Sequence, residues 1–183
     1  KAGVEVLGPS VNHSMVEFSV EKDRRAIRYG LGGIKNVGYS LAQAIVAERK
    51  AGGPYRSLDD LSSRLDSRHL TRKALESLIQ CGACDVLGTR YENLDRIDTV
   101  VVSRRQVQNQ ASLFGDVDVE PQPAARPAQE ERIPLDTRLS WERDLLGMYF
   151  SGHPLEKYKD ILSSVATPIS DLDLSMDGKE VTV

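Results

Sequence analysis

The sequence predicts a mainly α-helical protein that begins with a short β-hairpin and has a linker in its second half. Three observations favour this fold class. Apolar residues recur at three- and four-residue spacing through most of residues 34–102, which is typical of helices with one buried face. Apolar and polar residues alternate at 16–20 and 26–29, which is typical of short strands. Four prolines interrupt both patterns between residues 115 and 134.

The composition limits the class of protein. The chain has 183 residues, 24 Lys and Arg, 27 Asp and Glu and a formal net charge of −3, which fits one domain or two small ones. No run approaches the roughly 18 consecutive apolar residues of a membrane span, and two cysteines exclude a disulfide scaffold. We therefore expect a cytoplasmic protein. The start at Lys1 and the strand-like end at 181–183 predict a piece of a longer chain.

The first predicted element is a β-hairpin, in which the charged residues 21–25 connect the strands 16–20 and 26–29. A glycine-rich segment, 30–33, ends the second strand. A helix is predicted next, and Gly52-Gly53-Pro54 ends it, since glycine permits positive φ and proline cannot continue a helix. The expected apolar face of this helix contains Val37, Leu41, Ala44 and Ile45.

Two further helices are predicted from their capping residues. Ser57 caps the first, with Asp60 three residues later. Thr71 caps the second, and Gly82 stands where a helix commonly ends in glycine. Residues 34–82 would then form two successive helix pairs. The residues expected to face inward are Leu58, Leu61, Leu65, Ala74, Leu75, Leu78 and Ile79.

The rest of the chain contains one more predicted helix, a linker and a second ordered segment. β-branched residues at 100–102 weaken the helix prediction. Residues 115–134 are expected to form a flexible or extended linker. Order is expected to resume at 139–149, and 178–183 is typical of a strand whose sheet lies beyond the end. The helix prediction rests on Tyr91, Leu94, Ile97 and Val101.

Charge is distributed unevenly along the chain. Residues 22–73 contain twelve Lys or Arg and five Asp or Glu, a balance of +7, whereas residues 116–144 have a balance of −4. Basic segments are common in nucleic-acid-binding surfaces, because cations near phosphates release condensed counterions. The alternative is a solvated helical surface that binds nothing.

The segment Ile34-Lys35-Asn36-Val37-Gly38 has the pattern of the hairpin in a helix-hairpin-helix DNA-binding motif: apolar, any residue, small, apolar, glycine. In such a hairpin, backbone N–H groups approach a phosphate and the next helix adds its positive N-terminal end. Gly38 lacks the Cβ that would block this approach, and Lys35 adds a positive charge. Asn36 stands where glycine is usual, but asparagine tolerates a left-handed conformation. The alternative is a turn that only packs helices together.

The second helix pair carries cations at its turn. Its candidate DNA-binding residues are Arg68, Thr71, Arg72 and Lys73. Contacts of this kind hold a duplex by its phosphates and do not read its base sequence. Together with the basic balance of this region, they favour DNA binding over a plain packing unit.

The sequence offers no convincing catalytic or metal-binding residues. Cys81 and Cys84 have the spacing of a redox or metal motif, but they lie at a predicted helix C-terminus, whereas reactive pairs lie at an N-terminus that lowers the thiol pKa. A structural zinc site needs four ligands, and the three histidines are scattered. We therefore expect two buried structural thiols and no cofactor. His153 is expected to bond within its own turn.

The segment Gln110-Ala111-Ser112-Leu113-Phe114 lies where the last predicted helix meets the linker. Leu113 and Phe114 form an apolar pair with no local core around it. Such pairs commonly anchor a segment in a partner's pocket. The alternative is that they fold back onto Leu94 and Val101.

In their order along the chain, these segments resemble the α subunits of bacterial DNA polymerase III, a family of replicative polymerases. The match covers nearly the whole chain. Residues 3–12 resemble the end of that family's fingers region, although Gly8 and His13 depart from the usual residues, and 28–38 resemble its entry to the helix-hairpin-helix. Residues 110–114 resemble its sliding-clamp-binding peptide, and 142–155 resemble the segment before its OB-fold.

The resemblance implies an enzyme that extends a primer with two divalent metal ions, expected to be Mg²⁺, held by palm carboxylates. Those carboxylates would precede Lys1, so this segment is expected to be non-catalytic. The implied partners are primer–template duplex DNA, the sliding clamp and other replicase subunits that bind missing domains. The expected clamp-binding residues are Gln110, Ser112, Leu113 and Phe114.

The resemblance also predicts the division of the chain. The five expected parts are the end of the fingers region with the β-hairpin (1–33), a tandem helix-hairpin-helix DNA-binding domain (34–88), a helix that ends in the clamp-binding peptide (89–114), an acidic proline-rich linker (115–135) and a helical segment leading into a truncated OB-fold (136–183).

The leading hypothesis is therefore a segment that grips duplex DNA behind a polymerase active site and ties the enzyme to its clamp. A second hypothesis is the helix-hairpin-helix module of a DNA repair glycosylase or nuclease. That class needs a catalytic Lys or Asp shortly after the hairpin, and residues 39–51 offer no such arrangement. A third hypothesis is a thiol redox or zinc protein that uses Cys81 and Cys84.

Overall fold

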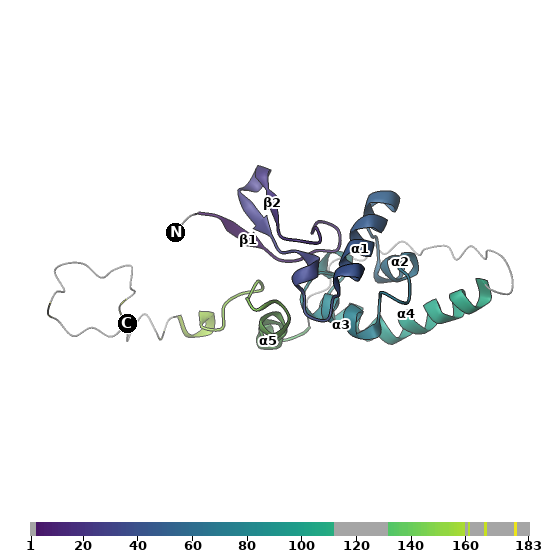
Figure 1. Cartoon of the computed structure of the whole chain (residues 1–183). Helices are drawn as coiled ribbons and strands as arrows, with labels where there is room; N and C mark the ends of the chain where they lie inside the picture. Colours follow the sequence, from purple (N-terminus) through teal and green to yellow (C-terminus); the bar gives the residue numbers. More distant parts are fainter. Residues whose placement is uncertain (1–2, 112–131, 160, 162–166, 168–177, 179–183) are drawn as a thin grey trace.

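The computed structural model describes residues 3–111, 132–159, 161, 167 and 178. This part of the chain contains three short strands, five α-helices and four short 3₁₀ helices. A small sheet extends to one side of helices α1 to α4, and α5 lies below the sheet in the view of Figure 1. The mainly α-helical class with a β-hairpin is thus confirmed. The expected start of an OB-fold falls on residues outside the described ranges.

The sheet contains the predicted hairpin and one additional strand. Strands β2 (Ser19–Glu21) and β3 (Ala26–Arg28) are antiparallel, and the 3₁₀ helix η1 (Lys22–Arg24) connects them. After η1, Arg25 takes a left-handed φ of 50°. The additional strand β1 (Glu5–Leu7) pairs in parallel with β3, so that the order is β1-β3-β2. Strand β1 was not predicted, because three residues give too short an alternation to recognise.

The helical part begins with the 3₁₀ helix η2 (Leu31–Gly33) and continues with α1 (Tyr39–Gly52), α2 (Leu58–Arg64), α3 (Arg72–Gln80), η3 (Asp85–Leu87) and α4 (Arg90–Ala111). The predicted caps of α2 and α3 are confirmed. The hydroxyl oxygens of Ser57 and Thr71 accept hydrogen bonds of 3.1 Å from the backbone N–H groups of Asp60 and Ala74. Gly53 follows α1 with a φ of 78° and ends it, as predicted.

The helices share one apolar core. The seven residues predicted to face inward on the second and third helices are all buried. On α1, Leu41 and Ile45 are buried as predicted, whereas Ala44 is only partly buried. The β-branched residues 100–102 do not interrupt α4, because Val100 is buried in this core. Packing here outweighs the low helix propensity of valine.

Helix α5 (Leu135–Leu146) packs against α3, and its Leu139 and Leu146 are buried. It begins before the predicted segment 139–149 and ends at Gly147, which has a φ of 75°. The short η4 (Glu156–Tyr158) follows. In the ranges described above, no helix has the length and apolar composition that crossing a membrane requires.

A buried ion pair joins the start of α4 to the middle of α5. Arg90 donates a hydrogen bond of 2.9 Å to Glu142, and the two side chains are 5% and 0% exposed. Glu142 also accepts from the backbone N–H groups of Phe150 (2.6 Å) and Ser151 (2.9 Å). Arg90 also donates to the carbonyl oxygen of Gln80 at the end of α3 (3.1 Å). This network therefore connects α3, α4, α5 and the turn after α5.

The surroundings of Glu142 keep its carboxylate charged. Burial alone would raise the pKa of Glu142, but hydrogen bonds from Ser151, from two backbone N–H groups and from Arg90 lower the pKa below its usual value. A carboxyl group whose pKa is lower in the folded state stabilises the fold above its unfolded-state pKa. This contribution is lost as the pH falls through the folded-state pKa.

We expect Glu142→Ala to destabilise the fold by about 2–4 kcal/mol, because it removes one of the two carboxylates paired with the buried Arg90, the other being Asp85, and leaves two backbone N–H groups without their acceptor. Denaturant unfolding followed by circular dichroism measures this free energy. The matched control is Asp136→Ala, which removes an exposed ion pair with Lys157 at the start of the same helix and should cost about 1 kcal/mol or less. Equal losses for the two variants would show that the buried pair does not hold α5.

Candidate nucleic-acid interface

The predicted hairpin residues 34–38 form a tight turn between η2 and α1. The Ile34 and Val37 side chains are buried, and the Val37 N–H donates to the Ile34 carbonyl oxygen (3.0 Å). Asn36 lies at the tip with a φ of 68°. The left-handed conformation predicted for Asn36 is confirmed, and its short polar side chain makes that conformation tolerable.

Two other helices hold the hairpin in place. The Asn36 side-chain amide donates a hydrogen bond of 3.0 Å to the Ser77 hydroxyl on α3. The Lys35 backbone N–H donates to the carbonyl oxygen of Leu145 on α5 (3.0 Å). The Tyr29 hydroxyl, near the start of the turn, lies 3.0 Å from the Leu146 carbonyl oxygen. Helix α5 therefore supports the hairpin directly.

Gly38 leaves open space at the N-terminus of α1. Its φ of −66° and ψ of 154° suit any residue, and a Cβ at this position would meet only the Ser40 hydroxyl oxygen at 4.0 Å. Neither the backbone nor the packing of the described residues therefore requires glycine here. Within the same residues, no intramolecular acceptor faces the Gly38 N–H, and no side chain caps α1. This position can accommodate a closely approaching anion.

The predicted contacts at the second turn are occupied by carboxylates. Arg68 lies 2.7 Å from Asp66, Arg72 lies 2.8 Å from Asp98, and Lys73 lies 3.7 Å from Glu76. Hydrogen bonds from Arg68 lower the pKa of Asp66 to about 2. The Thr71 hydroxyl caps α3. A phosphate would have to displace these carboxylates, so DNA contact at Arg68, Thr71, Arg72 and Lys73 stays a prediction.

A second turn with a left-handed tip connects α3 to α4 at Gly82, where the sequence predicted the end of a helix, but its likeness to the hairpin at 34–38 was not predicted. Gly82 forms its tip with a φ of 85°, and an apolar residue follows it, as Val37 follows Asn36. A tip residue followed by an apolar residue is the sequence pattern from which this likeness could have been predicted. Here, however, a Cβ on Gly82 would lie 2.4 Å from the Arg90 guanidinium. Arg90 therefore covers this turn, whereas the turn at Gly38 is open.

Cys81 and Cys84 are buried free thiols, as predicted. Burial raises the pKa of Cys81 to about 12 and raises that of Cys84 well above its usual value. Both groups are therefore protonated at neutral pH and unsuited to redox chemistry. Across the described ranges, no group of three or more His, Cys, Asp or Glu side chains could hold a metal ion. The His153 ring accepts a bond from the Leu155 N–H (3.2 Å), which confirms its local role.

The predicted clamp-binding peptide begins at the end of α4. Gln110 lies in the last turn of this helix. Ser112, Leu113 and Phe114 lie outside the described residues, so their availability to a partner stays a prediction. The alternative packing of Leu113 and Phe114 on Leu94 and Val101 is likewise untested.

Comparison with protein families places the chain in a defined class. A model described as a helix-hairpin-helix motif matches residues 3–94, which include the sheet, the open hairpin and α1 to α3. The chain belongs to this helix-hairpin-helix family.

The relatives give a closer comparison. The chain is similar to DNA polymerase III subunit alpha from Xylella fastidiosa, with 41% identity over 85% of this chain. It is also similar to the subunits of the same name from Deinococcus radiodurans and Thermus aquaticus, each 34% identical over 94% and 97% of this chain. The resemblance inferred from the motifs is thereby confirmed. The chain spans 13–15% of the length of these relatives.

We expect Asn36→Val to destabilise the fold by about 1–2 kcal/mol for the left-handed backbone and by about 1 kcal/mol more for the lost bond to Ser77. Asn36→Gly loses only the bond. Free energies of unfolding should therefore follow the order wild type, Asn36→Gly, Asn36→Val. Ser77→Ala is the control, because it removes the bond and leaves the tip unchanged. If Asn36→Val matched Asn36→Gly, the backbone conformation of the tip would not limit this position.

Proposed function

We propose that this chain is the duplex-gripping and clamp-tethering segment of a bacterial replicative DNA polymerase. The observation that carries the proposal is the unfilled space at Gly38 on a hairpin that α3 and α5 hold in place. The similarity to DNA polymerase III subunit alpha supports the polymerase context. The whole enzyme would join deoxynucleotides to a primer, and this segment would hold the product duplex.

The hairpin would bind one backbone phosphate. The Gly38 N–H and the first free N–H groups of α1 would donate to phosphate oxygens, and the positive end of the 14-residue helix would add to the attraction. The Lys35 backbone N–H is already bonded to Leu145, so Lys35 would contribute only its side-chain charge. Asn36 would position the tip through Ser77 and would not contact DNA through its amide.

Binding of this kind does not depend on base sequence, because phosphates are the same along the duplex. It weakens with salt, since each neutralised phosphate releases condensed counterions. Both properties suit a polymerase, which must hold duplex of any sequence while the duplex moves past the enzyme. The two divalent metal ions of the whole enzyme would be held by residues outside this chain.

A repair glycosylase or nuclease is the alternative class. Its catalytic Lys or Asp would have to lie on α1, shortly after the hairpin. The charged residues of α1 cluster at its far end, where Arg49 donates to the carbonyl oxygens of Val11 (2.7 Å) and Ser14 (2.8 Å). These bonds give Arg49 a structural role, and the relatives described above favour the polymerase.

We expect Gly38→Leu to weaken duplex binding at least tenfold, because the new side chain fills the space that the phosphate needs. Lys35→Ala should weaken binding less and should reduce its salt dependence by about one phosphate contact. Fluorescence anisotropy with a labelled duplex at several salt concentrations measures both effects. Unfolding free energies serve as the control, since no described protein atom obstructs the new side chain at its Cβ. Unchanged binding by a folded Gly38→Leu protein would contradict the assignment.

The sliding clamp would bind Gln110, Ser112, Leu113 and Phe114. Leu113 and Phe114 would enter an apolar pocket of the clamp, and Gln110 would form a hydrogen bond at its edge. Burying two such side chains contributes ~3–6 kcal/mol before ordering costs. The net affinity should therefore be modest, on the order of micromolar.

We expect the double variant Leu113→Ala, Phe114→Ala to abolish clamp-dependent long synthesis and to leave short primer extension and melting temperature unchanged. The matched control is Val117→Ala with Val119→Ala, which shortens two nearby apolar side chains outside the peptide. Surface plasmon resonance with immobilised clamp measures binding directly. A large fall in melting temperature with intact clamp binding would identify Leu113 and Phe114 as core residues instead.

A further inference from the structure

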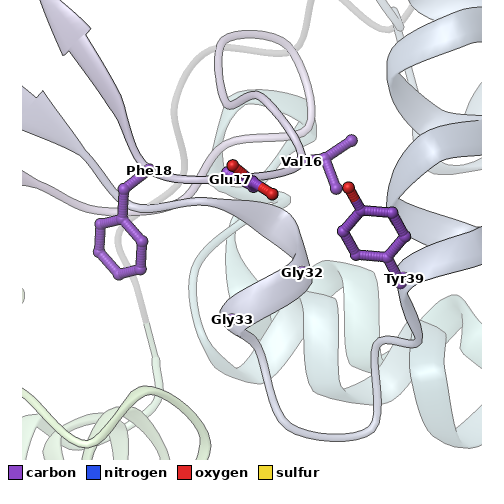
Figure 2. Close-up of a pocket in the computed structure, with 6 residues that line it drawn as sticks. All are labelled: Val16, Glu17, Phe18, Gly32, Gly33 and Tyr39. Carbon is purple, nitrogen blue, oxygen red and sulfur yellow. The ribbon is translucent and has the colours of Figure 1, made fainter.

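A hollow of about 400 Å³ lies next to the hairpin (Figure 2). One wall comes from Tyr39, the first residue of α1, which directly follows Gly38. Another comes from the segment that leads into β2, and η2 forms the floor. The lining residues are Val16, Glu17, Phe18, Gly32, Gly33 and Tyr39.

Two half-exposed aromatic side chains line the hollow, and the ring of one of them, Phe18, also packs against Tyr29 with ring centroids 4.5 Å apart. Figure 2 shows Tyr39 on one side of η2 and Phe18 on the other. Tyr39 is 56% exposed and Phe18 is 53% exposed. A Cβ on Gly32 would lie 3.0 Å from the Val16 carbonyl oxygen and 3.5 Å from the Tyr39 ring. Because Gly32 has no side chain, no atoms of this residue fill the space between η2 and the Tyr39 ring, and the hollow stays open.

The chemistry of the lining selects its occupant. The Glu17 carboxylate lies between the rings in Figure 2 and repels a phosphate. Aromatic faces favour a planar ring that can stack on them. A carboxylate accepts hydrogen bonds from the exocyclic amino groups of cytosine and other bases. These properties together match a nucleobase and disfavour the sugar–phosphate backbone.

We infer that this hollow binds an unpaired nucleobase of the DNA strand whose phosphate the hairpin holds. The inference rests on the proposed function, because the hairpin brings the strand to Tyr39. Tyr39 directly follows Gly38 and its side chain lines the hollow, so a nucleotide next to a phosphate at Gly38 would lie near the Tyr39 ring. The base must be unpaired, since a paired base has both faces covered by its neighbours in the stack.

The test compares a fully paired duplex with the same duplex carrying a short unpaired extension on either strand. The full chain should bind the extended DNA about tenfold more tightly, which corresponds to the stacking of one base on an aromatic ring. A 2-aminopurine in the extension should be quenched on binding. Tyr39→Ala should remove the tenfold gain and the quenching, and should change binding of the paired duplex much less, because alanine keeps the backbone N–H at the start of α1.

Two further variants separate stacking from other effects. Tyr39→Phe keeps the ring and should behave like wild type. Tyr158→Ala is the matched control, because it removes a tyrosine of similar exposure, 45%, far from the hollow in the sequence. Glu17→Ala should remove a preference for cytosine or adenine over thymine in the extension.

The outcomes distinguish the two proposals. If neither DNA binds, the phosphate contact at the hairpin and the base site both fail. If both DNAs bind equally and the 2-aminopurine is not quenched, the base site is wrong and the phosphate contact stands. If Tyr158→Ala and Tyr39→Ala both lost the tighter binding of the extended DNA, the base site would also be overturned. That result would indicate a general loss of structure in the variants.

Discussion

The ion pair between Arg90 and Glu142 is the interaction on which the arrangement of the second half of the chain depends. It joins two residues 52 positions apart and fully buries the carboxylate. Burying two charges is unfavourable unless hydrogen bonds replace the lost water, and here each partner has several. Glu142 also accepts bonds from the turn after α5, and Arg90 also holds the end of α3. Without this pair, α5 would keep its apolar contacts and the two hydrogen bonds that the Leu145 and Leu146 carbonyl oxygens accept.

The ion pair also supports the candidate DNA site, because it holds α5, and two backbone carbonyl groups of α5 contact the hairpin region. The Leu145 carbonyl oxygen accepts a bond from Lys35, and the Leu146 carbonyl oxygen lies within hydrogen-bonding distance of the Tyr29 hydroxyl. Asn36 is bonded independently to Ser77 on α3. The hairpin is thus fixed before any phosphate arrives, and a preorganised site loses less entropy on binding. Acid weakens this support as the pH falls through the lowered pKa of Glu142.

The sequence predicted the features that depend on near neighbours. Helix faces, the caps at Ser57 and Thr71, and the left-handed Asn36 all follow from residues within one or two turns of each other. The features it could not predict join distant residues. Strand β1 pairs with a strand 21 residues later, and Glu142 resembles any surface acid until the fold buries it. The cations at 68–73 looked available for phosphate because one of their partners, Asp98, lies 26 residues beyond Arg72.

The two left-handed turns show why a motif alone does not define a DNA site. Asn36 and Gly82 have the same type of backbone conformation, and an apolar residue follows each. At Gly82 the approach is filled by Arg90, the same side chain that holds Glu142. Two residues after the Asn36 tip, the space at Gly38 is open, and Tyr39 and Glu17 line the hollow next to the hairpin. One turn therefore serves the core and the other is open to solvent. The two turns share a backbone conformation and differ in whether a neighbouring side chain fills the space beside them.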